Sequence, residues 1–338
     1  MQIKKNISLK EYNTFGIEAK AKLFCEIKSI KGLIEISKTQ EYKDNKIFIL
    51  GGGSNILFTK DIDALVLKIS LNSIEKKIFL ENEYIVKASA GVVWHSLVVY
   101  CLENNLAGLE NLSLIPGSVG AAPMQNIGAY GAEIKDTFYS LEAFNIKKKK
   151  IETFDFKQCK FGYRESVFKN ELKDKYVIVS VSFKLSVIPS INIAYGAIEQ
   201  ELQQMGITAP TIKDVSEAVC NIRTSKLPNP KEIGNAGSFF KNPVILSEKL
   251  NELLEIYPRI VFYKVDNTSF KLAAGWLIEQ CGWKGKSNGN CGVHSKQALV
   301  IVNNGNASGA EIYNLSSEII ASVQQKFGVT LEREVNIV

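Results

Sequence analysis

The chain is poor in the residues that build most nucleophilic and metal centres. It has only two histidines, His95 and His294, and neither lies close in sequence to the glycine-rich segment Gly234–Pro243. A serine in that segment therefore lacks a neighbouring base, which weakens a nucleophilic role without excluding one, because a fold can bring distant residues together. The cysteines form no Cys-x-x-Cys pair and no metal-ligand spacing, so we expect no metal site. They are Cys25, Cys101, Cys159, Cys220, Cys281 and Cys291.

The sequence also lacks long apolar runs and a strong charge of either sign. No stretch approaches the length of a membrane span, and residues 1–10 carry lysines without the apolar core of a signal peptide. Scattered cysteines without an export signal predict a cytoplasmic protein. The net charge of +6 is modest, and the basic run Lys147–Lys150 lies between two strand-like pieces, which favours a hairpin tip over a nucleic-acid patch. We expect neither a nucleic-acid nor a membrane partner.

What the sequence does have is a mixture of strand and helix patterns over 338 residues, enough for two or three domains. This mixture predicts an α+β or α/β fold with several subdomains. Alternation and β-branched runs predict strands over 21–27, 47–50, 64–70, 74–91 (a pair), 138–146, 149–154, 176–185, 298–305 and 329–338. Apolar periodicity predicts helices over 31–42, 92–105, 195–222 (two, separated near Pro210), 247–257, 271–282 and 309–328.

Two glycine-rich stretches suit an extended anionic cofactor. Gly51–Gly53, followed by Ser54 and Asn55, come directly after a buried strand, where consecutive N–H groups can form a nest for a pyrophosphate. The same residues also fit a plain turn, and no known phosphate-loop spacing is present. Residues 108–134 hold many small residues, with Ser113, Gln125 and Asn126 as possible hydrogen-bonding groups. An ordered loop of that length is usually functional, although a surface loop is the alternative.

Two further segments carry reactive side chains. In Gly234–Pro243 we expect Ser238 on a tight, partly buried bend, where it either caps a helix or points at a ligand. Tyr163 and Arg164 follow a glycine, and Arg164 is suited either to orienting a carboxylate or to a structural ion pair.

Eight motifs follow one another along the chain: Asn13–Gly16, Leu50–Asn55, Gly108–Gly120, Gln125–Gly131, Phe161–Phe168, Gly234–Pro243, Lys271–Gly282 and Val293–Asn303. In this order, from about residue 13 to residue 335, they resemble one flavoenzyme family, the UDP-N-acetylenolpyruvoylglucosamine reductases. The resemblance implies an α+β fold of three subdomains. Two would form a PCMH/VAO-type FAD-binding unit and the third would bind substrate. The expected ranges are 1–70 with a return strand 328–338, 71–215, and 216–327.

The resemblance also implies a reaction. NADPH reduces noncovalently bound FAD, and the reduced flavin passes a hydride to C3 of UDP-N-acetylglucosamine enolpyruvate, giving UDP-N-acetylmuramate for peptidoglycan synthesis. Ser238 matches the proton donor to C2, which suits a weakly acidic hydroxyl because the carbon of an enolate is strongly basic. Arg164 and Glu334 match the residues that hold the substrate carboxylate and steady the enolate. Glu334 should either gain a proton or pair with a cation, and its neighbour Arg333 either tunes it or points away along the strand.

Further positions are assigned by the same resemblance, which also implies a monomer. The cofactor residues would be Gly51, Gly52, Gly53, Ser54, Asn55, Ser113, Pro116, Gly117, Gly120, Asn126 and Gly128. The substrate residues would be Tyr130, Tyr195, Lys226, Asn242 and Gln297, with Tyr195 on a mobile loop that closes over the diphosphate.

Two alternatives remain open. A carbohydrate oxidase on the related FAD scaffold often attaches FAD to a histidine or cysteine near the glycine loop, and residues 47–60 contain neither. A nonenzymatic nucleotide-sugar binding module would carry no flavin.

Overall fold

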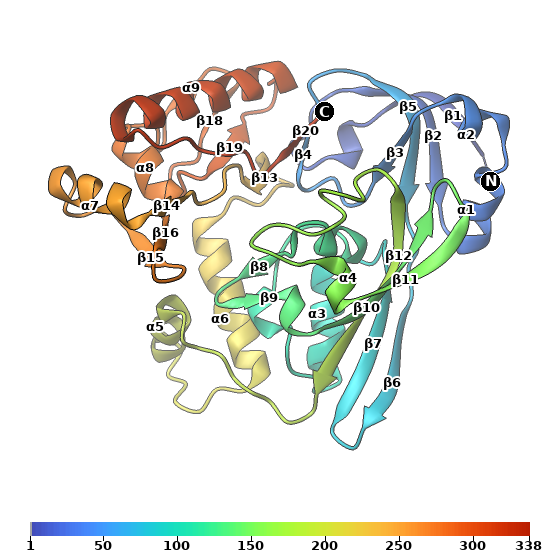
Figure 1. Ribbon diagram of the computed structural model, residues 1–338, viewed down its shortest axis with the longest axis horizontal. Coiled ribbons are helices and arrows are strands. Elements are labelled where there is room, and N and C mark those ends of the chain that lie inside the picture. The colour runs from blue at the N-terminus through green and yellow to red at the C-terminus, as the bar shows by residue number, and fades with distance from the viewer. Residues whose placement is uncertain (1) are drawn as a thin grey trace. The chain divides into compact units, whose positions relative to one another are not determined.

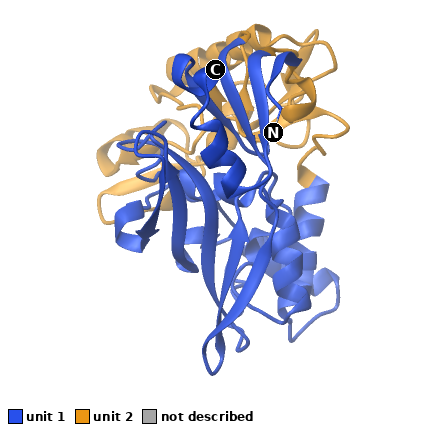
Figure 2. Ribbon diagram, turned by 90° about the vertical axis from the view of Figure 1, so that its right-hand side faces the viewer, with its two compact units in different colours: residues 1–7, 21–52, 62–225 blue, residues 8–20, 53–61, 226–338 orange. Residues whose placement is uncertain are grey.

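A computed structural model describes residues 2–338. The chain forms two compact units, shown in different colours in Figure 2. The first combines the N-terminal residues up to 7 with 21–52 and 62–225, and the second combines 8–20, 53–61 and 226–338. The chain passes from one unit to the other within the glycine turn, between Gly52 and Gly53. The three predicted subdomains divide the chain differently and stay a prediction.

The first unit contains a four-stranded sheet in the order β1-β2-β5-β3. Strands β2 (Lys20–Ile27) and β3 (Ile47–Leu50) both pair in parallel with β5 (Ile62–Ile69), and β1 (Lys4–Ser8) lies at the edge. Residues 64–67 of β5 are buried in succession, as expected for a central parallel strand covered on both faces. The strands predicted over 21–27, 47–50 and 64–70 are therefore confirmed.

A second, five-stranded antiparallel sheet in this unit has the order β11-β10-β12-β7-β6 (Figure 1). Helix α3 (Trp94–Glu103) buries Trp94, Leu97, Val98 and Cys101, the stripe that the apolar periodicity predicts. The lysine run forms the turn between β10 and β11, where Asn145 pairs with Lys150, so the predicted hairpin tip is confirmed. The strands are β6 (Ile74–Leu80), β7 (Glu83–Ser89), β10 (Phe138–Asn145), β11 (Lys150–Asp155) and β12 (Tyr176–Ser186).

Residues 108–134 are ordered and largely built into the first unit. They contain the 3-10 helices η2 (Glu110–Leu112) and η3 (Val119–Gln125) and the short hairpin β8 (Gly128–Ala129) and β9 (Ala132–Glu133). Leu109, Leu112, Val119 and Ala122 belong to the hydrophobic core under the five-stranded sheet, so the surface-loop alternative is wrong. The unit is completed by η4 (Ile134–Asp136), α4 (Phe156–Cys159), α5 (Gly196–Gln204) and α6 (Ile212–Lys226).

The second unit contains the sheet β13-β19-β18-β17 and the smaller sheet β14-β16-β15. Helix α9 (Gly309–Phe327) begins with a capping box between Ser308 and Glu311 and ends at Gly328 in the left-handed region. Strand β20 (Asn336–Ile337) pairs in parallel with β4 (Ile56–Leu57), so the C-terminus joins the segment that follows the glycine turn. The other elements are η1 (Lys10–Tyr12), β13 (Gly234–Ser238), β14 (Val244–Leu246), α7 (Ser247–Ile256), β15 (Phe262–Lys264), β16 (Ser269–Leu272), α8 (Ala274–Gln280), β17 (Ser287–Asn288), β18 (Cys291–Val293) and β19 (Val300–Asn303).

Two predicted elements differ from the structure. The helix expected over 31–42 is two helices, α1 (Ile30–Ile36) and α2 (Gln40–Asp44), because Thr39 accepts the N–H of Tyr42 and starts a second helix. The strand expected over 329–338 is regular only at β20, although residues 332–334 pair with residues 239–241. Within residues 2–338, no helix combines the length and apolar character needed to span a bilayer.

Candidate functional site

The glycine turn after β3 lies against a second glycine-containing segment of the first unit. A Cβ atom at Gly52 would lie 2.9 Å from the Gly117 Cα, and one at Gly51 would lie 2.9 Å from the Ser118 Oγ. Ser118 is buried, and its Oγ has no hydrogen-bond partner within residues 2–338. A buried hydroxyl without a partner costs free energy, so this atom points to a ligand that the protein receives here.

A lysine completes this part of the site. The Lys68 Nζ, on β5, donates a 2.6 Å hydrogen bond to the Gly51 carbonyl oxygen, and burial lowers the pKa of this amine. Glycine backbone, an unpartnered hydroxyl and a nearby amine fit the pyrophosphate of a dinucleotide. Sequence reasoning missed both Ser118 and Lys68, although Ser118 lies inside a motif that it singled out.

Gly53 packs against the first of the sequence motifs, Asn13–Gly16, in the second unit. Its φ is +66°, and a Cβ there would lie 1.9 Å from the Tyr12 carbonyl oxygen. Thr14 donates its N–H to the Gly53 carbonyl, while the buried Asn13 side chain donates to the Leu9 and Ile17 carbonyls. The motif therefore serves to shape the glycine turn.

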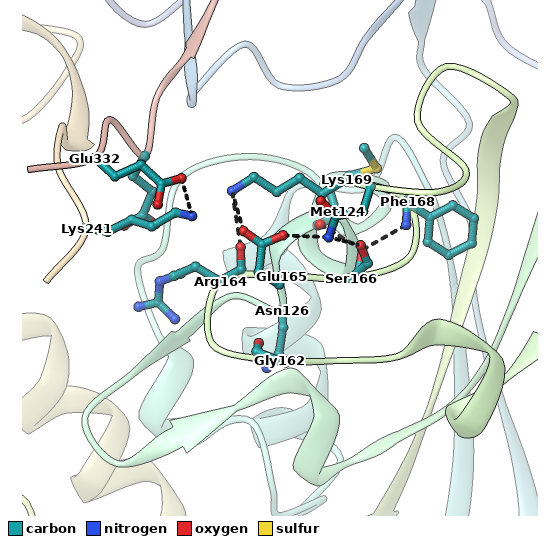
Figure 3. Close-up of polar contacts among 12 residues, drawn as sticks. Met124, Asn126, Gly162, Arg164, Glu165, Ser166, Phe168, Lys169, Lys241 and Glu332 are labelled. Carbon is teal, nitrogen blue, oxygen red and sulfur yellow. Dashed lines mark hydrogen bonds and ion pairs between the residues drawn. The ribbon is translucent and has the colours of Figure 1, made fainter. Parts of the chain in front are cut away.

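Several predicted cofactor residues use their polar atoms within the protein. The Ser113 Oγ bonds the Glu110 carbonyl and the Ser216 hydroxyl, and Gly120 lies so close to Ala90 that a Cβ would approach the Ala90 Cβ to 2.5 Å. Asn126 donates to the Gly162 carbonyl (Figure 3) and to Glu133, and accepts the Lys135 N–H. These residues hold the loop in shape. Their cofactor assignment stays a prediction, as it does for Ser54, Pro116, Gly117 and Gly128.

Arg164 is bound to the β8–β9 hairpin. Its Nη2 donates a 2.6 Å hydrogen bond to the Gly128 carbonyl, and its Nη1 lies 3.9 Å from the Glu133 Oε1. The side chain is 18% exposed, and the residue has φ +56°, an unusual conformation for arginine. Lys169 supports this turn by donating to the Arg164 carbonyl (Figure 3). The fold thus holds the guanidinium in a fixed, half-buried position, from which it can meet an anionic group.

Two predicted substrate tyrosines lie together at the tip of the same hairpin. The two-residue turn Tyr130–Gly131 has φ values of +50° and +79°, as a type I′ hairpin requires. The Tyr130 and Tyr195 rings meet edge to face at 5.4 Å, and the Arg223 Nε donates to the Leu114 carbonyl at 3.2 Å. Burial raises the pKa of Tyr130, while the charge of Arg223 lowers it. Sequence reasoning missed Arg223, which has no local signature.

Ser238 lies on a strand, and not on the tight, partly buried bend that the sequence predicts. It is the last residue of β13, it is exposed, and it faces Val300 of β19 across a register shift that follows Asn235. Gly237, at φ +69°, supplies the irregularity in the strand. Because β13 pairs with β19 and continues into residues 239–241, Ser238 caps no helix and presents its hydroxyl at an accessible position.

Glu334 is brought next to this segment in the second unit. Its N–H donates a 2.8 Å hydrogen bond to the carbonyl of Phe239, the residue after Ser238. The Asn55 Nδ2 donates to the Glu334 carbonyl at 3.3 Å. The neighbouring Lys241 Nζ bonds Glu332 at 2.6 Å (Figure 3). Two predicted catalytic residues from distant parts of the sequence thus lie on adjacent backbone segments.

The neighbours of these residues have defined positions as well. Arg333 bonds the hydroxyls of Ser316 and Ser317 on α9, so it points away from Glu334. Asn242 accepts the Ala274 N–H, and the Gln297 Oε1 would lie 3.3 Å from a Cβ at Gly275, so both predicted substrate residues lie at the start of α8. Lys226 is exposed at the end of α6.

Comparisons with known proteins show which family the chain is similar to. Residues 229–338 match the model of the C-terminal domain of UDP-N-acetylenolpyruvoylglucosamine reductase, and residues 21–153 match an FAD-binding domain. The UDP-N-acetylenolpyruvoylglucosamine reductase of Flavobacterium johnsoniae is 53% identical over 341 residues, with all of both chains covered. The chain belongs to the UDP-N-acetylenolpyruvoylglucosamine reductase family. A reductase of this name from Pseudomonas savastanoi is 48% identical, with 100% of this chain and 99% of the relative covered.

Solved structures show the same fold. The reductase from Thermus caldophilus superposes with a TM-score of 0.69 at 22% identity, covering 100% of this chain and 99% of that one. A p-cresol methylhydroxylase superposes with a TM-score of 0.51 at 11% identity, covering 97% of this chain and 84% of that one. The predicted PCMH/VAO-type α+β fold, the FAD cofactor and the oxidoreductase class are confirmed. The carbohydrate-oxidase alternative is not favoured, because the matched C-terminal domain is that of the reductase family.

Proposed function

We propose that the chain catalyses the NADPH-dependent reduction of UDP-N-acetylglucosamine enolpyruvate to UDP-N-acetylmuramate, as a cytoplasmic monomer. The full-length similarity to reductases of this name supports the reaction. The observation that carries the site assignment is the hydrogen bond from the Glu334 N–H to the Phe239 carbonyl, because it joins the segments of Ser238 and Glu334.

The cofactor would be held by the glycine turn of the first unit. Gly51, Gly52 and Gly117 allow close backbone approach, and the Ser118 hydroxyl and the Lys68 amine supply polar groups beside them. Bound FAD supplies the hydride that it receives from NADPH.

The chain's own residues bind the substrate carboxylate and supply one proton. Arg164, fixed by the Gly128 carbonyl, binds and orients the carboxylate and stabilises the negative charge that develops on it. Ser238 donates its hydroxyl proton to C2 of the substrate. Ser238 is exposed. A hydroxyl gives up its proton only to a strongly basic acceptor such as an enolate carbon, which suits a serine to this role. In the second unit, Glu334 lies beside the segment of Ser238 through its backbone contact with Phe239.

Tyr130, Tyr195, Lys226, Asn242 and Gln297 would bind the nucleotide sugar. The edge contact between the two tyrosines supports a shared role for them. Asn242 and Gln297 both lie at the start of α8, which supports a second group of polar contacts to the nucleotide sugar.

Anaerobic titration tests the proposal. The purified holoprotein should be yellow, bleach with NADPH, and recover its colour on addition of UDP-N-acetylglucosamine enolpyruvate, with UDP-N-acetylmuramate detected by mass spectrometry. UDP-N-acetylglucosamine, which lacks the enolpyruvyl group, is the control and should restore no colour. Recovery only with oxygen would contradict the proposal in favour of an oxidase, and a colourless protein that takes up no flavin would indicate a binding module.

A further inference from the structure

Glu133 is a half-buried carboxylate that the proposed mechanism does not use. It lies on β9, where it pairs with Gly128 across the hairpin, and its side chain is 23% exposed. Its two oxygens have different partners. The Oε2 lies 2.7 Å from the Lys135 Nζ and accepts a 3.0 Å hydrogen bond from the Asn126 Nδ2, while the Oε1 lies 3.9 Å from the Arg164 Nη1. Glu133 thus joins the hairpin to the arginine that is predicted to bind the substrate carboxylate.

Gly128 makes room for this contact. A Cβ atom there would lie 2.7 Å from the Glu133 Cγ and 3.2 Å from the Arg164 Nη1, so a side chain would push these two groups apart. The Gly128 carbonyl also accepts the hydrogen bond from the Arg164 Nη2 at 2.6 Å. The hairpin therefore contacts the guanidinium at two nitrogens, Nη2 through the backbone and Nη1 through the charge of Glu133.

The turn that carries Arg164 is tied to the same hairpin. Asn126, which donates to Glu133, also donates a 3.0 Å hydrogen bond to the carbonyl of Gly162, two residues before Arg164 (Figure 3). The centroid of the Tyr163 ring lies 5.3 Å from the Arg164 Cζ. The carboxylate of Glu133 and the backbone of Arg164 are therefore held in a defined position relative to each other.

The distances suit Glu133 to orienting Arg164 without neutralising it. A carboxylate at hydrogen-bond distance would occupy N–H donors that a substrate carboxylate needs, and 3.9 Å is too long for such a bond. The nearer Lys135 ammonium takes up much of the charge of Glu133, and its contact with this carboxylate raises the pKa of Lys135. Attraction across 3.9 Å still opposes rotation of the guanidinium about its hydrogen bond to Gly128.

We propose that Glu133 is a positioning residue that sets the plane of the Arg164 guanidinium for two parallel hydrogen bonds to the carboxylate of the enolpyruvyl substrate. The proposal rests on the proposed function, which assigns that carboxylate to Arg164. One hydrogen bond to the Gly128 carbonyl fixes a point of the guanidinium and leaves its plane free to turn, whereas bidentate recognition needs a defined plane. Glu133 supplies the second contact.

Binding of two ligands to the oxidised holoenzyme tests the proposal. UDP-N-acetylglucosamine enolpyruvate carries the carboxylate, and UDP-N-acetylglucosamine lacks it. Glu133→Gln keeps the size of the side chain and removes its charge, so the Kd for the enolpyruvyl ligand should rise about fivefold, as expected for the loss of a partly exposed ion pair. The Kd for UDP-N-acetylglucosamine should stay unchanged, because the orientation of the guanidinium matters only to a ligand with a carboxylate.

Two further variants separate positioning from structural damage. Glu142→Gln is the matched control, since this half-buried carboxylate also pairs with a lysine, Lys87 at 2.8 Å, and accepts from the Ser180 hydroxyl at 2.9 Å in the same unit. It should change neither Kd. Arg164→Lys removes the planar group that Glu133 orients, so adding Glu133→Gln to it should weaken enolpyruvyl binding no further. FAD content and melting temperature check that each variant is folded.

An unchanged Kd for the enolpyruvyl ligand in Glu133→Gln, or an equal loss for both ligands, would overturn the proposal. Effects that multiply in the double variant would overturn it as well, because Glu133 would then act independently of Arg164. The proposed function fails separately. Wild-type protein that binds no enolpyruvyl sugar would overturn that function, and wild-type affinity in Arg164→Lys would overturn its assignment of the carboxylate to Arg164.

Discussion

The N–H of Glu334 donates a 2.8 Å hydrogen bond to the carbonyl of Phe239. The contact belongs to a short antiparallel pairing in which the Lys241 N–H also donates to the Glu332 carbonyl, and Phe240 pairs with Arg333. The N–H of Phe239 donates in turn to the Leu299 carbonyl, so this residue lies between β19 and the C-terminal segment. Ser238 therefore precedes a backbone segment that is hydrogen-bonded on both sides, which fixes its position although its side chain is exposed.

Asn55 should matter for catalysis through this pairing. Asn55→Ala removes the donor to the Glu334 carbonyl and should lower the free energy of unfolding by about 1 kcal/mol. Because Glu334 loses an anchor, flavin reoxidation by the enolpyruvyl substrate should also slow. Asn336→Ala is the matched control, since its Nδ2 donates to the Asn55 carbonyl and not to that of Glu334. Equal reoxidation rates in both variants would contradict a role for Asn55 in placing Glu334.

Alanine substitutions at Gly53 and Gly16 separate the cost of a steric clash from the cost of a left-handed backbone conformation. Both have φ +66°, but a Cβ at Gly53 would lie 1.9 Å from the Tyr12 carbonyl oxygen, whereas one at Gly16 meets nothing within 4 Å. Gly16→Ala should cost about 1 kcal/mol in urea unfolding, because only the left-handed conformation is penalised. Gly53→Ala should cost several times more or prevent folding. Similar losses for the two variants would show that the contact of Gly53 with Tyr12 is unimportant.

Ser118 should bind the cofactor and contribute nothing to the fold. Ser118→Ala removes a buried hydroxyl that has no partner, so the apoprotein should be as stable as the wild type or slightly more stable. Its Kd for FAD, measured by quenching of flavin fluorescence, should rise about tenfold. Ser113→Ala should differ in stability, losing about 1 kcal/mol, because its hydroxyl bonds the Glu110 carbonyl and the Ser216 hydroxyl. Unchanged FAD affinity in Ser118→Ala would refute the assignment.

His95 should make the loop sensitive to acid. Its Nδ1 accepts the Leu114 N–H, which requires the form with this nitrogen unprotonated, and burial together with the charge of Arg223 lowers its pKa. A lowered native pKa means that stability is fully present above the unfolded value of about 6.5 and is lost as the pH falls through the native pKa. His95→Asn keeps an acceptor that does not titrate, so its melting temperature should fall less between pH 7 and pH 5. If the melting temperatures of the wild type and of His95→Asn fell equally between pH 7 and pH 5, this role of His95 would be contradicted.

Much of the fold is predictable from local patterns. The stripe Trp94, Leu97, Val98 and Cys101 predicts α3, and the buried apolar run of β5 predicts a central strand. The interruption between α1 and α2 within residues 31–42 also has a local cause in the sequence, since Ser29 and Thr39 both act as N-caps. The bend expected at Ser238 is wrong because Gly237 adjusts a strand that pairs with β19, and this partner is distant in sequence.

The candidate site is predictable only where a motif carries it. The motifs supplied Arg164, Ser238, Glu334 and the tyrosines, but not Ser118, Lys68 or Arg223. The importance of these three arises from tertiary contacts: an unpartnered hydroxyl beside Gly51, an amine on the Gly51 carbonyl, and a guanidinium that bonds the Leu114 carbonyl and lowers the pKa of Tyr130 through its charge. No local pattern distinguishes them from ordinary polar residues.

The half-reactions of Ser238→Ala test the central claim most directly. Stopped-flow measurement should show NADPH bleaching the flavin within about twofold of the wild-type rate, while reoxidation by UDP-N-acetylglucosamine enolpyruvate slows by about 10²–10⁴-fold or more, because the proton donor is missing. An equal loss in both half-reactions, or a reoxidation rate close to that of the wild type, would contradict the assignment of Ser238 as the proton donor.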